Sequence, residues 1–290
     1  MKRILVILLS MLNIAAFAQL SAVDYNSKDF AQFKASKTFV VQSGDPVFDG
    51  EVEKAMKESW KITSFDFISG KEFEKKVSDP SASFIVLIVI GDQQTYGQNY
   101  HYLALVNGGK KKITSYSYEE MLAYAPINHW GGEWEMTDCG FRVRNMIESM
   151  IQAMDLVQKN DIHGNTKKIV DKLQLVYNEH AKDIKKRTLL VCEDEIGGEI
   201  KGHKPKLLTK AEFAGLYPFK FEFVSKARLT EVINSRSKDY YYLQLASTLN
   251  KSIFVFDPSN GEVVYFEYKI MGLTLKDSDV KDLVMQMNGK

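Results

Sequence analysis

The chain has 290 residues, of which 45% are hydrophobic and 26% are charged. These values are ordinary for a globular protein with enough residues for two modest domains. Its formal net charge is only +1, so composition provides no strong field that would attract nucleic acid or an anionic membrane. We therefore expect no nucleic-acid partner.

The first 18 residues have the layout of a secretory signal peptide. Lys2 and Arg3 form a positive region, residues 4–12 are apolar, and residues 16–18 form an A-x-A cleavage site. This segment is too short and wrongly flanked for a permanent membrane span, and a buried amino-terminal helix is the alternative interpretation. No cysteine stands at the cleavage point, and no later run reaches 18 apolar residues. The pattern predicts an exported protein, periplasmic or secreted, that is neither lipid-anchored nor membrane-spanning once the peptide is removed.

The stretch of residues 65–87 occurs twice. Shifted by 156 positions, it aligns with residues 221–243 without a gap. The identical positions are Phe65 and Phe221, Phe67 and Phe223, Ser69 and Ser225, Ser81 and Ser237, and Leu87 and Leu243. The apolar pattern also agrees across a strand, a helix and a second strand. The repeat predicts two copies of one module.

The elements of the first copy follow a polar lead-in segment, residues 19–36. Asp45 and Pro46 are a cap and a first-turn proline, and they predict the start of a helix that continues to Trp60. Residues 69–77 and 141–157 have the apolar spacing of further helices. Short apolar or alternating runs predict strands at residues 38–41, 62–68, 84–90, 100–106 and 112–116. Residues 118–140 have no counterpart in the second copy.

The second copy repeats this order. Strands are expected at residues 188–191, 219–224, 240–246, 252–256 and 262–268, and helices at residues 209–216, 226–234 and 275–287. A further helix begins at Thr166. The fold class is therefore α/β (α+β): two tandem β-α-β-α-β-β-β-α modules, each a mixed sheet with packed helices. The predicted boundaries are a signal peptide at residues 1–18, modules at 37–158 and 188–290, and a helical linker at 159–187.

This order of elements resembles the amino-terminal module of the periplasmic TolB protein. It is also similar to the curli secretion lipoprotein and to penicillin-binding-protein activator lipoproteins. Residues 38–41, 65–77, 84–90, the turn at 107–109 and the helix 141–157 carry the resemblance, which the second half repeats. The chain lacks both the propeller of TolB and the lipobox of the lipoproteins. The resemblance implies an interaction or scaffolding role in the cell envelope.

Signatures of known chemistry are absent from the sequence. It contains no GxSxG, HExxH, GxGxxG or phosphate-loop motif, so we expect no catalytic residues and no cofactor. No pair of histidines has ligand spacing, and no metal site is expected among His101, His129, His163, His180 and His203. The two cysteines, Cys139 and Cys192, could form a disulfide in an oxidising compartment or serve as small buried apolar residues.

One local cluster is the candidate site. It brings two of the three tryptophans, two glycines and three acidic residues together, and its members are His129, Trp130, Glu133, Trp134, Glu135 and Asp138. Long connections with their own aromatic residues are often functional, and tryptophan is favoured at binding hot spots. The alternative is a lid whose tryptophans are buried over the sheet.

The sequence therefore predicts an exported, non-enzymatic protein that binds an envelope protein partner. Two alternatives stay open. One is a hydrolase of saccharides or cell-wall fragments in which Glu133 and Glu135 act as paired carboxylates. The other is a small-ligand carrier that binds between the modules.

Overall fold

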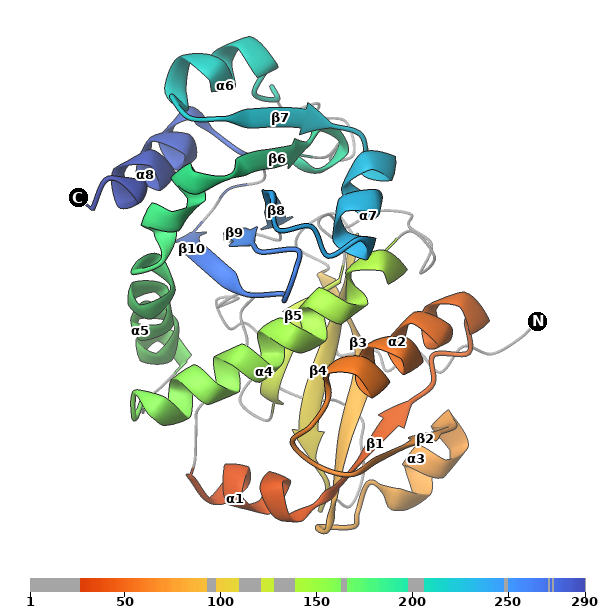
Figure 1. Ribbon diagram of the computed structural model, residues 1–290. Helices are drawn as coiled ribbons and strands as arrows, with labels where there is room; N and C mark the ends of the chain where they lie inside the picture. Colours follow the sequence, from red (N-terminus) through yellow and green to blue (C-terminus); the bar gives the residue numbers. More distant parts are fainter. Residues whose placement is uncertain are drawn as a thin grey trace.

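The computed structural model describes residues 27–92, 98–109, 121–127, 139–162, 166–197, 206–247, 250–270, 272 and 274–289. Two five-stranded mixed sheets with packed helices make up the protein (Figure 1). The predicted α+β class with two sheet modules is therefore confirmed. The predicted signal peptide lies outside the described residues.

The first module has the sheet order β2-β1-β3-β4-β5. Strand β1 is parallel to β2 and to β3, and the remaining pairs are antiparallel. Its elements are α1 (Ser27–Ala35), β1 (Lys37–Val41), α2 (Pro46–Ser59), β2 (Phe65–Ile68), α3 (Gly70–Lys76), β3 (Ala82–Asp92), β4 (Gln98–Asn107), β5 (Met121–Pro126), the 3-10 turn η3 (Gly140–Arg142) and α4 (Val143–Lys159).

The second module repeats this topology, with the order β7-β6-β8-β9-β10. Its elements are α5 (Thr166–Asn178), η4 (Ala181–Lys186), β6 (Thr188–Cys192), η5 (Glu193–Glu195), α6 (Lys210–Leu216), β7 (Phe221–Val224), α7 (Lys226–Asn234), β8 (Tyr240–Ser247), β9 (Asn250–Phe256), β10 (Val263–Ile270) and α8 (Asp277–Met287). The segment predicted as a linker contains α5 and η4, and α5 packs against β10.

Helix starts follow the capping residues of the sequence. The Asp45 side chain accepts hydrogen bonds from the backbone N–H groups of Val47 and Phe48 at the start of α2. Two serines that are identical in the repeat, Ser69 and Ser225, cap α3 and α7. A shared cap explains why these serines match, since it satisfies N–H groups that the first helical turn leaves free.

The gap-free alignment of the repeat is wrong in its third strand. Thr38 of β1 faces Phe65 in β2 and Ser83 in β3. The equivalent residue of β6, Leu189, faces Phe221 in β7 and Tyr241 in β8. The offset is therefore 156 positions in the second strand and 158 in the third. Helix α7 has nine residues and α3 has seven, which accounts for the slip. A two-residue slip keeps every side chain on its own face of a strand, so the apolar pattern conceals it.

Two further expectations need correction. The lead-in segment contains helix α1, whose Phe30 and Phe33 are buried in the core. The strand expected at residues 112–116 lies outside the described residues. Among the described strands, β4 pairs with β3 and with β5. Strand β5 lies inside the segment that was expected to have no counterpart, and it corresponds to β10.

The two modules share one core. In the first sheet, α2 and α4 cover one face and α3 covers the other. In the second sheet, α6 and α8 cover one face, while α7, α5 and α4 cover the other. Helix α4 thus lies between the two sheets (Figure 1). The two modules therefore meet through non-equivalent faces: the face of the first sheet covered by α2 and α4 packs against the face of the second sheet covered by α7.

Candidate binding surface at the module junction

The predicted site residues His129, Trp130, Glu133, Trp134, Glu135 and Asp138 all lie outside the described residues, so that prediction stays a prediction. The residues on both sides of the segment are described. Ile127 directly follows β5 and is 0% exposed, and Cys139 directly precedes η3 and is 4% exposed. The two residues that flank residues 128–138 are therefore both buried in the shared core at the module junction.

A buried ion pair connects the modules beside this point. Arg142 of η3 donates a hydrogen bond to the carboxylate of Glu195 in η5, and their side chains are 1% and 3% exposed. Burial alone would lower the pKa of Arg142, but the charge and hydrogen bond of Glu195, together with Cys139 and Tyr242, raise it more than burial lowers it. Neither module alone could satisfy its member of this buried pair.

Polar side chains of β8 extend this contact. Asn145 of α4 donates through its Nδ2 to the hydroxyl of Tyr242 at 3.1 Å. Two residues further along β8, the amide of Gln244 lies 3.5 Å from the carbonyl oxygen of Pro126 in β5. Burial raises the pKa of Tyr242 above its ordinary value of 10.0, so this hydroxyl is protonated. The junction is thus a hydrogen-bonded interface that specifies how the two modules fit together.

The rim of the junction is charged. Ser59 at the end of α2 donates to Glu148 of α4 at 2.8 Å, and Arg236, just after α7, donates to both Glu58 and Glu148. Arg144 donates to the backbone oxygen of Ile233 at 2.7 Å. Burial raises the pKa of Glu148, although Ser59, Arg144 and Arg236 oppose that shift. Three separate elements therefore meet at one partly buried carboxylate.

The two cysteines at the junction are buried. Cys139 and Cys192 are both free and buried, so the disulfide that the sequence permitted is not formed. Burial raises the pKa of Cys192 to about 12. A thiol that is protonated at neutral pH is a poor nucleophile and a poor metal ligand. The interpretation of both residues as small buried apolar groups fits this environment.

His101 is a half-buried histidine of the first module. It lies on β4, and burial lowers its pKa to about 4. The imidazole is therefore neutral at physiological pH and cannot switch its charge there. Within the described ranges, no three His, Cys, Asp or Glu side chains come close enough together to hold a metal ion.

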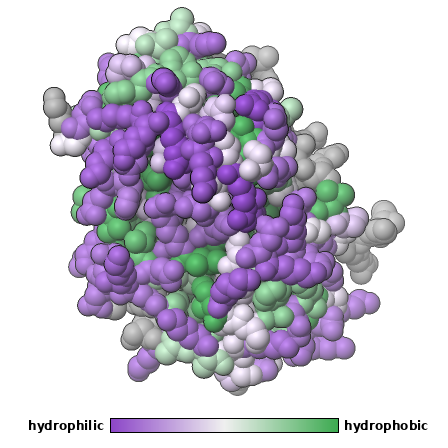
Figure 2. All heavy atoms as spheres, in the orientation of Figure 1, coloured by the Kyte–Doolittle hydropathy of each residue, from purple (hydrophilic) through white to green (hydrophobic). Residues whose placement is uncertain are grey.

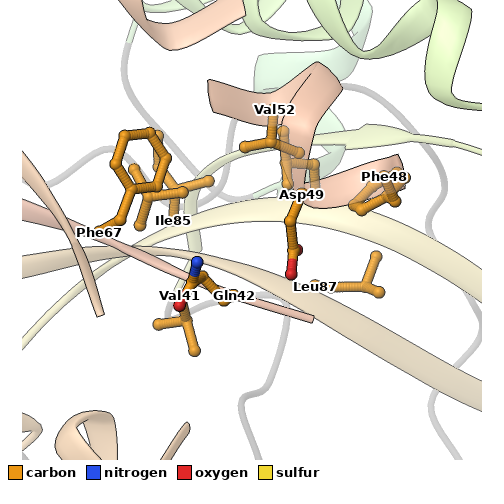
Figure 3. Close-up of a pocket in the computed structure, with 10 residues that line it drawn as sticks. Val41, Gln42, Phe48, Asp49, Val52, Phe67, Ile85 and Leu87 are labelled. Atoms are coloured by element: carbon orange, nitrogen blue, oxygen red, sulfur yellow. The ribbon is translucent and has the colours of Figure 1, made fainter. Parts of the chain in front are cut away.

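A small cavity lies under the amino-terminal end of α2 (Figure 3). Its volume is about 10 Å³, enough for about one water molecule. Figure 3 shows Phe67, Ile85 and Val52 around it, with Asp49 reaching toward the end of β1. Asp49 accepts hydrogen bonds from the backbone N–H groups of Ser43 and Gly44. Since Asp45 also caps this helix, carboxylates already occupy the position where an anion would bind.

A second hollow lies beside α6 and the start of α8, and its lining includes Lys206, Glu212 and Lys276. Lys206 and Glu212 are paired with each other at 2.5 Å. Both hollows are lined from one module only. Neither corresponds to the inter-module groove that a small-ligand carrier requires.

The sequence interpretation missed a buried charge network in the second module. Lys251 of β9 donates to Asp279 of α8, and their side chains are 2% and 0% exposed. Lys269 of β10 also donates to Asp279, at 2.9 Å, and to Asp282, at 2.6 Å. This network joins α8 to the sheet. The sequence signal for this network was Lys251, which is in phase with Ile253 and Val255 on the face of β9 that packs against α6 and α8.

Comparisons with known proteins add no further assignment. No protein-family model matches the chain. No curated protein and no solved structure matches it either. None of the helices in the described ranges combines the length and the hydrophobicity that a membrane crossing requires.

Proposed function

We propose that the chain is an exported, non-enzymatic protein of the cell envelope that binds another envelope protein. In this proposal the partner contacts residues 128–138 and the module junction from which they extend. The signal-peptide pattern and the resemblance to envelope modules support the location and the class of function. No resident metal or cofactor is part of the proposal.

The observation that carries the proposal is the fixed junction. Ile127 and Cys139 are buried, and the Arg142–Glu195 pair holds the two modules together directly beside Cys139. A loop whose ends are held on a rigid scaffold loses less conformational entropy on binding than a loop whose ends are free. Residues 128–138 supply two tryptophans, a residue type enriched at binding hot spots.

The test is crosslinking in cells. Wild-type protein is compared with a Trp130→Ala/Trp134→Ala variant after circular dichroism has established that the variant folds. The matched control is Leu175→Ala on α5, because Leu175 is another large apolar residue and is 70% exposed. We expect one specific envelope partner in wild type and in the control, and its loss in the double-tryptophan variant.

A partner that persists in the double-tryptophan variant would place binding elsewhere and contradict the proposed surface. If wild type shows no partner, the interaction proposal itself fails. Purified protein would then be assayed on glycans with and without Glu133→Gln and Glu135→Gln. Turnover that depends on these carboxylates would favour the hydrolase that the sequence left open.

A further inference from the structure

The second sheet protects one of its two edges with side chains. On β10, the backbone N–H of Phe266 donates to Asn178 Oδ1 at 2.9 Å, and that of Tyr268 donates to Gln174 Oε1 at 3.3 Å. Both acceptors belong to α5. An edge strand otherwise presents unpaired N–H and C=O groups to other chains. Helix α5 therefore closes the β10 edge.

The opposite edge, β7, is different. In the described part of the chain, β7 pairs with β6 alone. Leu189 of β6 faces Phe221 and donates to the backbone oxygen of Lys220 at 3.0 Å. The parallel pattern then directs the backbone N–H and C=O of Glu222 toward β6. The same groups of Phe221 and Phe223 point away from the sheet, toward the free edge.

The side chains along this edge alternate strictly. Phe219, Phe221 and Phe223 are partly exposed beside α6, and Phe221 and Phe223 lie against Phe213, with ring centroids 4.9 and 5.5 Å from it. Lys220 and Glu222 are exposed and alternate with the phenylalanines. Figure 2 shows hydrophobic surface among hydrophilic residues at the end of the molecule formed by α6 and β7. The edge thus has an aromatic face and a face with one positive and one negative charge.

We propose that a second copy of this chain adds its β7 antiparallel to this edge, about a two-fold axis through Phe221. Phe221 then faces the partner's Phe221, and the two exchange the backbone hydrogen bonds that point away from each sheet. Phe219 faces the partner's Phe223. Lys220 faces the partner's Glu222, and symmetry repeats this ion pair. The two five-stranded sheets become one ten-stranded sheet in a closed dimer.

The charges favour the register with the two-fold axis through Phe221 over the neighbouring register with the axis through Glu222. A two-fold axis through Glu222 would place two glutamates directly opposite each other, which destabilises a strand pair. The axis through Phe221 instead aligns opposite charges twice and aromatic rings three times, and such cross-strand pairs are stabilising. One five-residue segment, residues 219–223, therefore complements itself.

The equivalent edge of the first module lacks this self-complementarity. Strand β2 has Phe65, Asp66 and Phe67 where β7 has Phe221, Glu222 and Phe223. Ser64 stands in the place of Lys220, and Asp66 is already paired with Lys37 at 2.5 Å. In the equivalent register of two copies of β2, Asp66 would face the partner's Ser64, so no ion pair would form across the contact. The inference thus applies to β7 and provides β2 as an internal control.

Sedimentation velocity of purified protein tests the interface, at concentrations up to about 300 µM because a short strand-to-strand contact lies at the weak end of specific interfaces. We expect a concentration-dependent dimer. Glu222→Lys opposes lysines at both symmetry-related positions and should weaken self-association about tenfold or more. Lys220→Glu/Glu222→Lys exchanges the charges and should restore it. Asp66→Lys on β2 should leave it unchanged.

A wild type that stays monomeric over the whole series overturns the proposal. It is also overturned if Glu222→Lys and the charge-exchanged variant weaken the dimer equally, because facing charges would then not be the cause. Both substitutions are at exposed positions, so the variants are expected to fold, and circular dichroism checks that they do.

Cysteine crosslinking tests the register. A mixture of Lys220→Cys and Glu222→Cys proteins should form a covalent dimer under mild oxidation, because directly opposed residues of a non-hydrogen-bonded pair lie about 4.5 Å apart at Cα. Each variant alone should crosslink far less. Efficient crosslinking of Glu222→Cys alone would indicate the register about Glu222 and overturn the proposed one. This interface uses no residue of 128–138, so loss of the envelope partner and loss of the dimer are separate results.

Discussion

The two modules have the same strand order but bury opposite faces toward each other. The first meets the second through α2 and α4, and the second meets the first through α7 and the neighbouring sheet. The closing helices show the consequence. Helix α4 buries nine of its side chains, from Val143 to Val157, whereas α8 buries four. A duplicated module can therefore serve as the centre of the fold in one copy and as its outer layer in the other.

The largest expected effect comes from the buried Arg142–Glu195 pair, which joins the two modules. Arg142→Met leaves the buried carboxyl of Glu195 without its partner, and we expect a loss of about 3–5 kcal/mol in the free energy of unfolding, measured by urea denaturation. The matched control is Arg228→Met, whose partner Glu231 is 67% exposed. Exposed pairs contribute about 1 kcal/mol or less.

A double variant sharpens this test. Arg142→Met/Glu195→Leu removes both charges and replaces them with apolar groups, so we expect unfolding free energy near that of wild type or above it. If the double variant is as unstable as the single, the destabilisation comes from packing and not from an unpaired charge.

The next effect compares the two closing helices. Met150 of α4 is 0% exposed, and Met285 of α8 is 44% exposed. Met150→Ala removes a side chain from the shared core, and we expect a loss of about 2–5 kcal/mol. Met285→Ala should change the unfolding free energy by about 0.5 kcal/mol or less. If Met150→Ala and Met285→Ala lower the unfolding free energy equally in thermal and urea unfolding, α4 does not pack between the two sheets as described.

The third comparison concerns the two equivalent serine caps. Ser69 forms a capping box with Glu72 of α3, whereas Ser225 accepts one hydrogen bond, from the N–H of Arg228 in α7. Ser69→Ala and Ser225→Ala should each cost about 1 kcal/mol, with the larger loss at Ser69 because its substitution also disrupts the capping box. Glu72→Ala, measured by the same urea titration, should reproduce part of the Ser69 effect. Glu231→Ala in α7 is the matched control.

The sequence was sufficient for the order of elements and for the repeat, because alternation in strands and caps at helices are local signals. Tyr241 illustrates this, because it packs with the core on one face of the sheet while Tyr240 and Tyr242 pack on the other, as strand alternation requires. The position of β5 and the two-residue slip at α7 were missed. Both depend on which strands pair, and pairing is not a local property.

The candidate site was less accessible to sequence reasoning. Tryptophan content identified residues 128–138, but no local pattern indicated that Arg142 and Glu195 would meet across 53 positions of chain. Lys251 and Asp279 are a similar case. A charged residue in an otherwise buried pattern predicts only that a partner exists, and tertiary packing decides which residue it is.

The smallest expected effect is a dependence on pH that differs between the two closing helices. Burial raises the pKa of Glu148 on α4 above its ordinary value of 4.5. A raised folded pKa contributes stability that is present below the unfolded value and lost as pH rises through the folded one. Burial of Asp279 on α8 would also raise its pKa, but hydrogen bonds from Lys251 and Lys269 outweigh this and lower it. Its contribution is present above its unfolded value and lost as pH falls through the folded one.

Urea titrations from pH 3 to pH 7 separate these carboxylates. Glu148→Gln keeps an acceptor for Ser59 but cannot titrate, so its difference from wild type should grow in the variant's favour as pH rises above about 4.5. Asp279→Asn should lose most relative to wild type near pH 7 and least in acid, because there the wild-type carboxyl is itself protonated. If both variants show the same sign of pH dependence, the two closing helices do not have the opposite electrostatic environments inferred here.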